Sequence, residues 1–392
     1  MKARQFPFSP RIWAALGLLA SVLAILGLFF SGVKPFLQAY LFSYIFWLEL
    51  SLGSLALAML VYLTNGSWGH VSRWISLAGA KTLWLMLILF IPIALGIPHL
   101  YPWADSAKVA ADAVLAHKTP YLNMPFFLAR AAIYFAVWIF FAYRLGNLAQ
   151  RKETYADPEK LQSFRLSSAI GIIIYFLTMT FAAIDWIMSL EPDWYSTIFG
   201  MLVISAQALS SLALVLLFLP SLAKREPLRS LITTRNYQDL GGLLFACVLL
   251  WIYLAFSQLL IIWSGNLPVE ITWYVNRTSG GWLWIKLLVL AFQFLIPFLF
   301  LITEGAKKNP RLMAGLSLLI LSMRLVDNYW TVMPAFSPQQ FTLHWLDFVL
   351  PLAIGGLWLA VFSWFLNRAS IFIPETKRTA KVVQSEMSSP SQ

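Results

Sequence analysis

The chain has 392 residues, of which 60% are hydrophobic and only 11% are charged, with a formal net charge of +11. Soluble domains carry about 25% charged residues, so this composition excludes a soluble globular protein and indicates an integral membrane protein. The single cysteine, Cys247, excludes a disulfide framework, a cysteine-ligated iron–sulfur cluster and a multi-cysteine zinc site. The four histidines are too scattered to favour metal or haem ligation.

Ten stretches of the chain have the length and composition of a membrane-spanning helix, which needs about 20 mainly apolar residues. The alternating pattern of barrel strands is not seen, so helices are the expected form. The predicted spans are residues 12–31, 37–64, 81–100, 123–145, 165–189, 196–220, 240–264, 281–303, 311–334 and 347–367. The sequence therefore predicts an all-α integral membrane protein with ten transmembrane helices.

The basic residues are divided unevenly between the two sides of the membrane. With the N-terminus in the cytoplasm, 21 of the 28 Lys and Arg residues fall in cytoplasmic segments and 4 in outer loops. The other three, Arg130, Lys286 and Arg324, lie inside predicted helices. Because cytoplasmic loops are enriched in Lys and Arg, we expect a multi-pass protein of the bacterial inner membrane with both termini in the cytoplasm. The positive charge then requires no nucleic-acid partner.

The two ends of the chain flank two predicted four-helix bundles. Residues 1–36 hold the cytoplasmic N-terminus and a flanking helix, which we interpret as retained because no cleavage site followed by a polar stretch is evident. Residues 37–195 form the first bundle (spans two to five), and residues 196–334 form the second (spans six to nine). Residues 335–372 hold the other flanking helix. The Ser-rich tail, residues 373–392, is predicted to be disordered.

Ionisable groups within the predicted first bundle are candidates for binding or proton transfer, because a charge in the bilayer costs about 2–3 kcal/mol and is retained for function or pairing. The topology places Glu49, His99, Arg130 and Asp185 in the outer half of this bundle. A carboxylate beside a His and an Arg can be tuned to accept protons. The structural alternatives are a lone interfacial histidine at position 99 and a helix-end Asp185 that faces water.

The predicted second bundle has its own polar set, interpreted as a polar core or a proton path: Gln258, Lys286, Gln293, Glu304, Arg324 and Asp327. On a regular helix Lys286, Gln293 and Glu304 fall within about 20° of one line, and Arg324 and Asp327 are helical neighbours. Hydrogen-bonded helix contacts and a buried ion pair are the alternative interpretations of the same residues. Lys286 lies near enough to its helix end to reach the interface.

Several long motifs resemble one known family. They are AIDWIMSLEPDWYST at residues 183–197, FSQLLIIWSGNLP at 256–268, HLYPW at 99–103, RLVD at 324–327 and HWLD at 344–347. Together they resemble the ActF-like, quinone-binding-type membrane subunits of alternative complex III (quinol:cytochrome c oxidoreductase), within the polysulphide-reductase or NrfD-like family. The resemblance extends from about residue 36 to residue 367.

This resemblance implies two four-helix bundles in a complex that oxidises quinol and passes electrons to cytochrome c or a terminal oxidase. The implied partners are a paralogous NrfD-like membrane subunit, an iron–sulfur subunit and c-type haem subunits. By matching motifs, His99 and Asp185 would be quinone-pocket or proton-carrying residues, and Arg324 and Asp327 would belong to the polar core of the second bundle. The chain would hold no redox cofactor of its own, and its one small-molecule ligand would be a quinone, menaquinone or ubiquinone.

Two hypotheses follow from the sequence. In the first, the chain is a membrane subunit of a quinol-oxidising respiratory complex and contributes a quinone-type pocket, a proton pathway or a structural scaffold. In the second, it is a secondary transporter, because ten spans, a possible duplication and charges near the midplane also fit that class. Broken helices at the midplane would support the second hypothesis, and Pro92, Pro98 and Pro297 are the candidate positions.

Overall fold

The structure is a computed structural model and describes residues 9–64, 66–149, 158–224, 229 and 232–368. Throughout these residues the regular secondary structure is helical, with no strand. Nine of the helices are long and apolar enough to cross a membrane, and a bent pair brings the number to ten if it counts as one span. The prediction of an all-α, multi-pass membrane protein is confirmed to this extent. The predicted tail, residues 373–392, lies outside the described residues.

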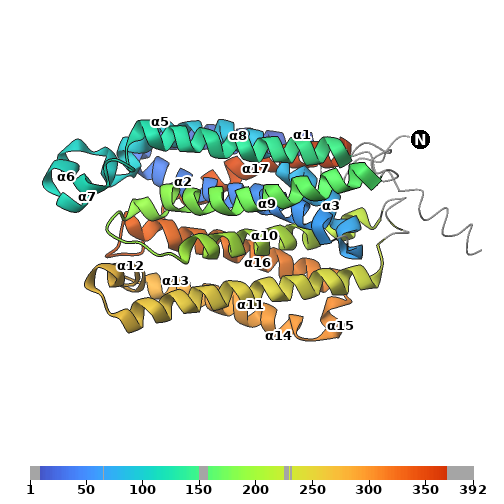
Figure 1. Cartoon of the computed structure of the whole chain (residues 1–392). Coiled ribbons are helices and arrows are strands. Elements are labelled where there is room, and N and C mark those ends of the chain that lie inside the picture. The colour runs from blue at the N-terminus through green and yellow to red at the C-terminus, as the bar shows by residue number, and fades with distance from the viewer. Residues whose placement is uncertain (1–8, 65, 150–157, 225–228, 230–231, 369–392) are drawn as a thin grey trace, which may run out of the picture.

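The helices run mainly along one direction and form an elongated bundle (Figure 1). The long ones are α1 (Pro10–Ser31), α2 (Val33–Thr64), α8 (Met124–Ala149), α9 (Pro158–Trp186), α10 (Phe199–Leu222), α11 (Thr234–Gly265), α16 (Pro310–Val332) and α17 (Leu346–Arg368). Short helices α6 (Ser106–Ala111), α7 (Ala113–Lys118) and α12 (Pro268–Thr278) gather at one end, at the left of Figure 1. This end is called the α12 end. The opposite end carries α15 (Glu304–Lys307) and is called the α15 end.

Helix α2 lies at the centre of the bundle. It packs against α9, α10, α16 and α17, as well as α3 (Ser67–Ala80) and α5 (Ile91–Leu100). Most residues in the apolar part of α2 are buried. Helix α1, in contrast, is largely exposed and packs mainly on α17. Helices α2 and α9 of the predicted first bundle thus contact α10 and α16 of the predicted second bundle, and the buried side chains form one continuous core.

The third predicted span begins earlier than expected and is bent. Helix α3 fills a region expected to be a cytoplasmic loop, and α4 (Leu83–Leu89) and α5 continue it with a bend of 53° between the segments Trp68–Leu89 and Ile91–Leu100. Pro92 lies in the first turn of α5, where it provides no N–H and crowds the carbonyl four residues earlier. The proline accounts for the position of the break. Arg73 and Lys81, expected in that loop, are both buried.

The eighth predicted span is also interrupted. Helix α13 (Trp282–Val289) passes into a π-helical segment, Leu290–Leu295, before α14 (Ile296–Leu301) ends the span. A π-helical turn contains more residues than an α-helical turn. The side chains that follow it therefore point in directions that differ from those on a regular α-helix. The expected line of Lys286, Gln293 and Glu304 is therefore not continuous, and Glu304 begins the separate helix α15.

Candidate functional site

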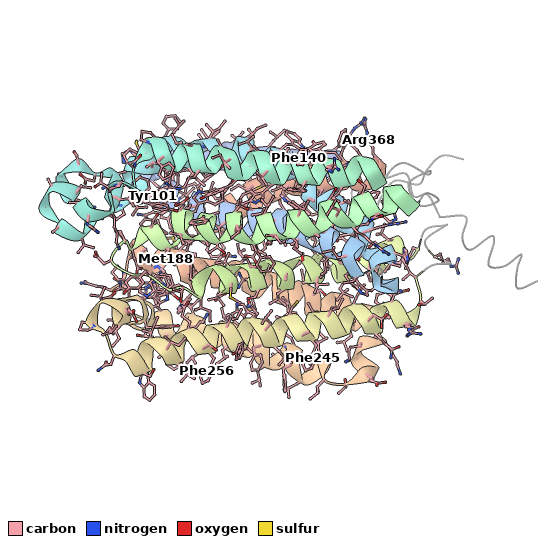
Figure 2. All side chains as sticks on the ribbon, viewed as in Figure 1. Tyr101, Phe140, Met188, Phe245, Phe256 and Arg368 are labelled. Carbon is pink, nitrogen blue, oxygen red and sulfur yellow. The ribbon has the colours of Figure 1, made fainter. Side chains whose placement is uncertain are left out.

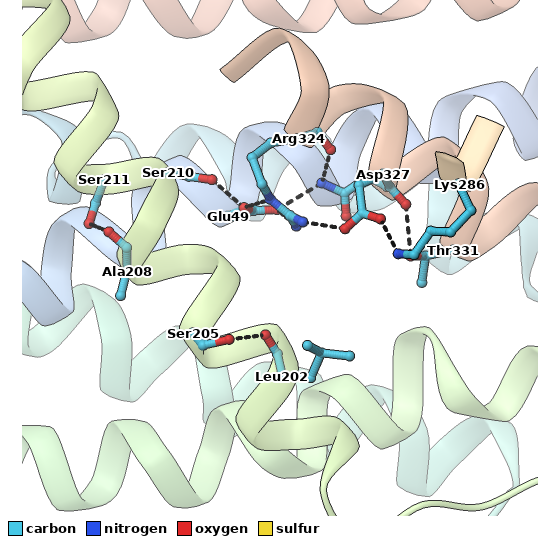
Figure 3. Close-up of polar contacts among 11 residues, drawn as sticks. Glu49, Leu202, Ser205, Ala208, Ser210, Ser211, Lys286, Arg324, Asp327 and Thr331 are labelled. Carbon is cyan, nitrogen blue, oxygen red and sulfur yellow. Dashed lines mark hydrogen bonds and ion pairs between the residues drawn. The ribbon is translucent and has the colours of Figure 1, made fainter. Parts of the chain in front are cut away.

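A chain of buried charges crosses the centre of the bundle (Figure 3). Glu49, in the middle of α2, receives both hydrogen bonds of a two-pronged contact from Arg324 on α16. Arg324 Nε lies 2.9 Å from Glu49 Oε1, and Nη2 lies 3.0 Å from Oε2. Asn328 Nδ2, one turn after Arg324, donates to Glu49 Oε2 at 2.7 Å, and the Ser210 hydroxyl on α10 donates to Oε1. Each of these partners of the carboxylate, on α10 and on α16, is thus a hydrogen-bond donor.

The close approach of α2 and α10 makes the Ser210 contact possible. Gly53 lies one turn after Glu49 on α2, and a Cβ atom at this position would overlap the backbone carbonyl of Gln207 on α10. Only glycine lets the two backbones come this near without displacing one of them. Gly53 therefore brings the serine-bearing face of α10 up to the carboxylate of Glu49.

The chain continues from Arg324 to Asp327 and Lys286. Arg324 Nη1 donates to Asp327 Oδ2, and Lys286 Nζ, on α13, lies 2.9 Å from Asp327 Oδ1. Glu49, Arg324 and Asp327 are almost fully buried, whereas the Lys286 side chain is 29% exposed and lies 4.0 Å from the centre of the Trp330 ring. These two acids and two bases alternate, so the formal charge of the four side chains together is zero. We call Glu49, Arg324, Asp327 and Lys286 the central charge chain.

A small cavity of about 50 Å³ lies against the central charge chain. Its walls include Glu49, Arg324 and Asp327, together with Asn328 and Trp251. A polar cavity needs only about 10–15 Å³ of this kind of volume to hold one water molecule. The space is therefore sufficient for a few waters in contact with three of the four charged groups.

A second buried ion pair lies nearer the α12 end, between α8 and α9. Arg130 Nε and Nη2 each donate to one oxygen of Asp185 at 2.8 Å, and the Tyr134 hydroxyl donates to Asp185 Oδ2 at 2.9 Å. Asp185 is completely buried. The Tyr121 ring covers the guanidinium at 3.9 Å from its centre, and the Tyr121 carbonyl accepts from Nη1 at 2.9 Å. The arginine is therefore held on all sides.

A larger pocket of about 330 Å³ opens beside this ion pair at the α12 end. Tyr121 and Ser189 line it, and the Ser189 hydroxyl donates to the backbone carbonyl of Asp185. Its other walls are mainly apolar, with Ile184, Met188 and Trp194 among them. Pockets that bind small organic ligands have volumes of about 300–1,000 Å³ and this kind of mixed lining.

A third ion pair lies outside the spanning segments, where α12 meets the loop after α9. Arg277 Nη1 lies 2.8 Å from Glu191 Oε1, and Nη2 donates to the carbonyl of Thr331 at 2.7 Å. The Arg277 guanidinium lies 3.0 Å from the centre of the Trp273 ring. Burial raises the pKa of Glu191 above its ordinary value of 4.5, against the opposing effect of the Arg277 charge, and burial lowers the pKa of Arg277 to about 10.

Glu191→Gln is expected to reduce the pH dependence of stability in the acidic range. The pKa of Glu191 is higher in the folded state than in the unfolded state, so its protonation stabilises the fold at low pH. This contribution is complete below about pH 4.5 and is lost as the pH rises through the folded-state pKa. Melting temperatures between about pH 4 and pH 7 measure the effect. Asp193→Asn, at an exposed neighbouring carboxylate, is the control, and equal pH profiles for Glu191→Gln and the unmodified chain would contradict the prediction.

The structure brings together some of the residues expected in the first bundle and separates others. Arg130 and Asp185 form an ion pair, as their shared depth suggested. Glu49 lies instead with Arg324, because the side chain of Glu49 faces α10 and α16 rather than α8. His99 is exposed on α5 and belongs to neither group.

The residues expected in the second bundle also divide. Lys286, Arg324 and Asp327 form a connected group, whereas Gln258 is buried and accepts a hydrogen bond from Ser196 at 3.2 Å. Gln293 is fully buried in the π-helical segment, and neither of its polar side-chain atoms has a hydrogen-bond partner within the described residues. Glu304 was expected in the polar core, but its side chain is 78% exposed at the start of α15.

Sequence reasoning missed the neutral partners and one ion pair. Ser210, Asn328 and Tyr134 were not singled out, because a single Ser, Asn or Tyr in a span is ordinary helix composition. The Glu191–Arg277 pair was missed because Glu191 belongs to a loop and Arg277 to a predicted outer segment. Asn328 alone carried a signal, since it lies four residues after Arg324 and so on the same face of the helix.

No protein-family model and no curated protein matches this chain. Among the residues that the structure describes, no three His, Cys, Asp or Glu side chains are grouped closely enough to hold a metal ion. The charged side chains at the centre of the bundle can bind protons and polar or charged ligands.

Proposed function

We propose that the chain is a membrane subunit of a quinol-oxidising respiratory complex and that its own contribution is a proton pathway. The observation that supports this most is the central charge chain, four ionisable residues in direct contact across α2, α16 and α13. Ionisable residues that face the interior of a membrane bundle and pair with one another are typical of proton relays. In this proposal the protein belongs to the bacterial inner membrane, with both termini in the cytoplasm.

The central charge chain would pass protons rather than store them. Its formal charge is zero, and an unpaired charge at its buried groups is costly, so a proton that enters at one end favours release of a proton at the other. Lys286 is the most exposed member and supplies the entry or exit point. The cavity beside Glu49, Arg324 and Asp327 has room for water that would link these groups to one another.

The pocket at the α12 end supports the quinone part of the proposal. Its volume of about 330 Å³ and its apolar walls suit a ring with polar substituents, and Asp185 lies directly behind Tyr121 and Ser189. A proton from a bound quinol would reach the Arg130–Asp185 pair past Tyr121, which lines the pocket and covers the Arg130 guanidinium. The electron carriers would belong to partner subunits: a paralogous NrfD-like membrane subunit beside an iron–sulfur subunit and c-type haem subunits.

The test is proton release during quinol oxidation by the complex that contains this chain, reconstituted in vesicles. Asp327→Asn is expected to lower proton release about tenfold or more, because it removes the carboxylate between Lys286 and Arg324. Glu304→Gln is the matched control, an acid-to-amide change at an exposed position, and is expected to have no effect. Unchanged proton release from a fully assembled Asp327→Asn complex would contradict the proposal.

The alternative function, a secondary transporter, is favoured by two observations. The span that contains α3, α4 and α5 is bent by 53°, and the span that contains α13 and α14 includes a π-helical segment. Interrupted helices of this kind form the binding sites of many transporters. Extraction of the native membrane distinguishes the two functions, since a stable multi-subunit assembly with haem supports the respiratory complex and a monomer or homodimer supports the transporter.

A further inference from the structure

A cavity of about 290 Å³ lies toward the α15 end, and none of the four residues of the central charge chain lines it. Three elements form it: α3 with the turn that follows, the last turns of α8, and the last turns of α17. Its walls include Trp74, Lys81, Gly146, Trp364, Phe365 and Arg368. Figure 2 shows Arg368 at this end of the molecule. The cavity therefore combines aromatic walls with two basic side chains.

Lys81 is the unusual residue in this cavity. It is only 9% exposed, yet its ammonium group makes no hydrogen bond or ion pair with any oxygen of the described residues. Its neighbours are rings: Nζ lies 5.5 Å from the centre of Phe365 and 6.0 Å from the centre of Tyr143. Lys81 lines the cavity, so the three N–H groups of its ammonium are available to a ligand that is not part of this chain.

Gly146 holds the space for this side chain. A Cβ atom at position 146 would overlap Lys81 Cε and would lie 2.9 Å from Nζ. Any other residue there would push the ammonium out of its present position. The position of Lys81 in the cavity therefore depends on a glycine at position 146 of α8.

Among the described residues, the charged side chains that line the cavity are basic. Arg368 lies over the Trp364 ring at 4.1 Å from its centre and adds a second cation, and no acidic side chain of the described residues lines the cavity. A ligand with a phosphate group would satisfy the Lys81 ammonium and gain from Arg368. Trp74 and Phe365 would contact an apolar portion of the same ligand.

The cavity lies beside the ends of two helices that are long and apolar enough to cross a membrane. These helices are α8, which ends at Ala149, and α17, which ends at Arg368. Trp364 is 40% exposed here, and tryptophans at helix ends are typical of the interface between lipid and water. Basic pockets between transmembrane helices on the cytoplasmic side bind the headgroups of anionic lipids.

We propose that this cavity binds the phosphate of an anionic phospholipid, with Lys81 as the central contact and Arg368 as the second. The acyl chains would extend from the headgroup along the exposed surfaces of α8 and α17. This site is separate from the proposed proton pathway, shares no residue with it and does not depend on it.

The test is thermal unfolding of the full-length chain, purified in detergent with the subunits it retains. The added ligands are dioleoylphosphatidylglycerol, dioleoylphosphatidylcholine and inorganic phosphate. Phosphatidylglycerol is expected to raise the melting temperature, and the concentration for half of the effect is expected to rise about fivefold in Lys81→Met. Gly146→Ala keeps every charge but displaces Lys81, so it is expected to weaken the effect as well. Lys308→Met, which removes one exposed charge at the same end, is expected to respond as the unmodified chain does.

Four results would overturn the proposal. Equal stabilisation by phosphatidylcholine would show that any lipid suffices, and equal stabilisation by inorganic phosphate would show a simple anion site. Equal responses of Lys81→Met and Lys308→Met would show that the cavity is not involved. If the Lys81 and Gly146 variants do not fold, native mass spectrometry of the unmodified chain decides: retained phosphatidylglycerol supports the site, and its absence contradicts it.

Discussion

Arg324→Met is expected to destabilise the protein more than any other single change at the centre of the bundle, by about 3–5 kcal/mol. Arg324 is the cation between Glu49 and Asp327, and it donates to both. Without it, Glu49 keeps only the neutral donors Ser210 and Asn328, while Asp327 keeps Lys286. One buried negative charge is then left uncompensated, and the free energy of unfolding in detergent measures the loss.

The double variant Glu49→Met/Arg324→Met is the decisive control for this prediction. It removes one acid and one base together, and the remaining pair of Asp327 and Lys286 is neutral. Replacement of a whole buried ion pair by apolar residues is often neutral in stability, so the double variant is expected to recover most of what Arg324→Met loses. If the double variant is as unstable as the single one, the charge pairing is not the reason for the loss.

Arg130→Met is expected to produce the second-largest loss, also about 3–5 kcal/mol. Asp185 is completely buried, and both of its oxygens accept from Arg130. After the substitution only the Tyr134 hydroxyl would remain on this carboxylate. The variant also removes the guanidinium from beneath the Tyr121 ring, so the wall of the 330 Å³ pocket is expected to loosen. Thermal unfolding and limited proteolysis of the α12 end measure the two effects.

The matched comparison is Arg130→Met/Asp185→Leu, which removes both charges. It is expected to be more stable than Arg130→Met, since no buried charge is left without a partner. Asp185→Asn alone keeps the shape of the side chain but leaves the arginine unpaired at the protein interior. If Arg130→Met or Asp185→Asn is as stable as the unmodified chain, the Arg130–Asp185 pair contributes little to the stability of the fold.

The sequence predicted the helices of this protein better than it predicted the contacts within the candidate site. Long apolar runs indicated the helices, because a membrane-spanning segment must be about 20 apolar residues long and must satisfy its own backbone. The same hydropathy missed α3, whose residues are too polar to resemble a span, although its buried face packs on α2 and α10. The sequence also did not predict the interruption of the expected helix over 281–303, because a π-helical segment has no hydropathy signature.

The charged residues illustrate the difference more sharply. The sequence identified Glu49, Arg130, Asp185, Lys286, Arg324 and Asp327 as charges inside the bundle, because each interrupts an apolar run. It grouped them by position along the chain, and so it placed Glu49 with Arg130 and Asp185. In the structure Glu49 pairs with Arg324, a residue 275 positions away, because Gly53 lets α2 approach α10 and α16 approaches from the other side.

The sequence alone indicated that the chain is a helical, multi-pass membrane protein and that six ionisable residues, Glu49, Arg130, Asp185, Lys286, Arg324 and Asp327, lie inside the bundle, since these features depend on composition over a single helix length. It was wrong for Glu304 and His99, which are exposed, and for Arg73 and Lys81, which are buried. Only the tertiary structure decided which charges meet, where cavities lie beside them, and that Lys81 is buried at the α15 end. The physical reason is that a helix sequence fixes depth and direction for each side chain, whereas pairing depends on which helices touch and at what rotation. Small residues such as Gly53 and Gly146 set those contacts, and their effect becomes visible only when the neighbouring helix is in place.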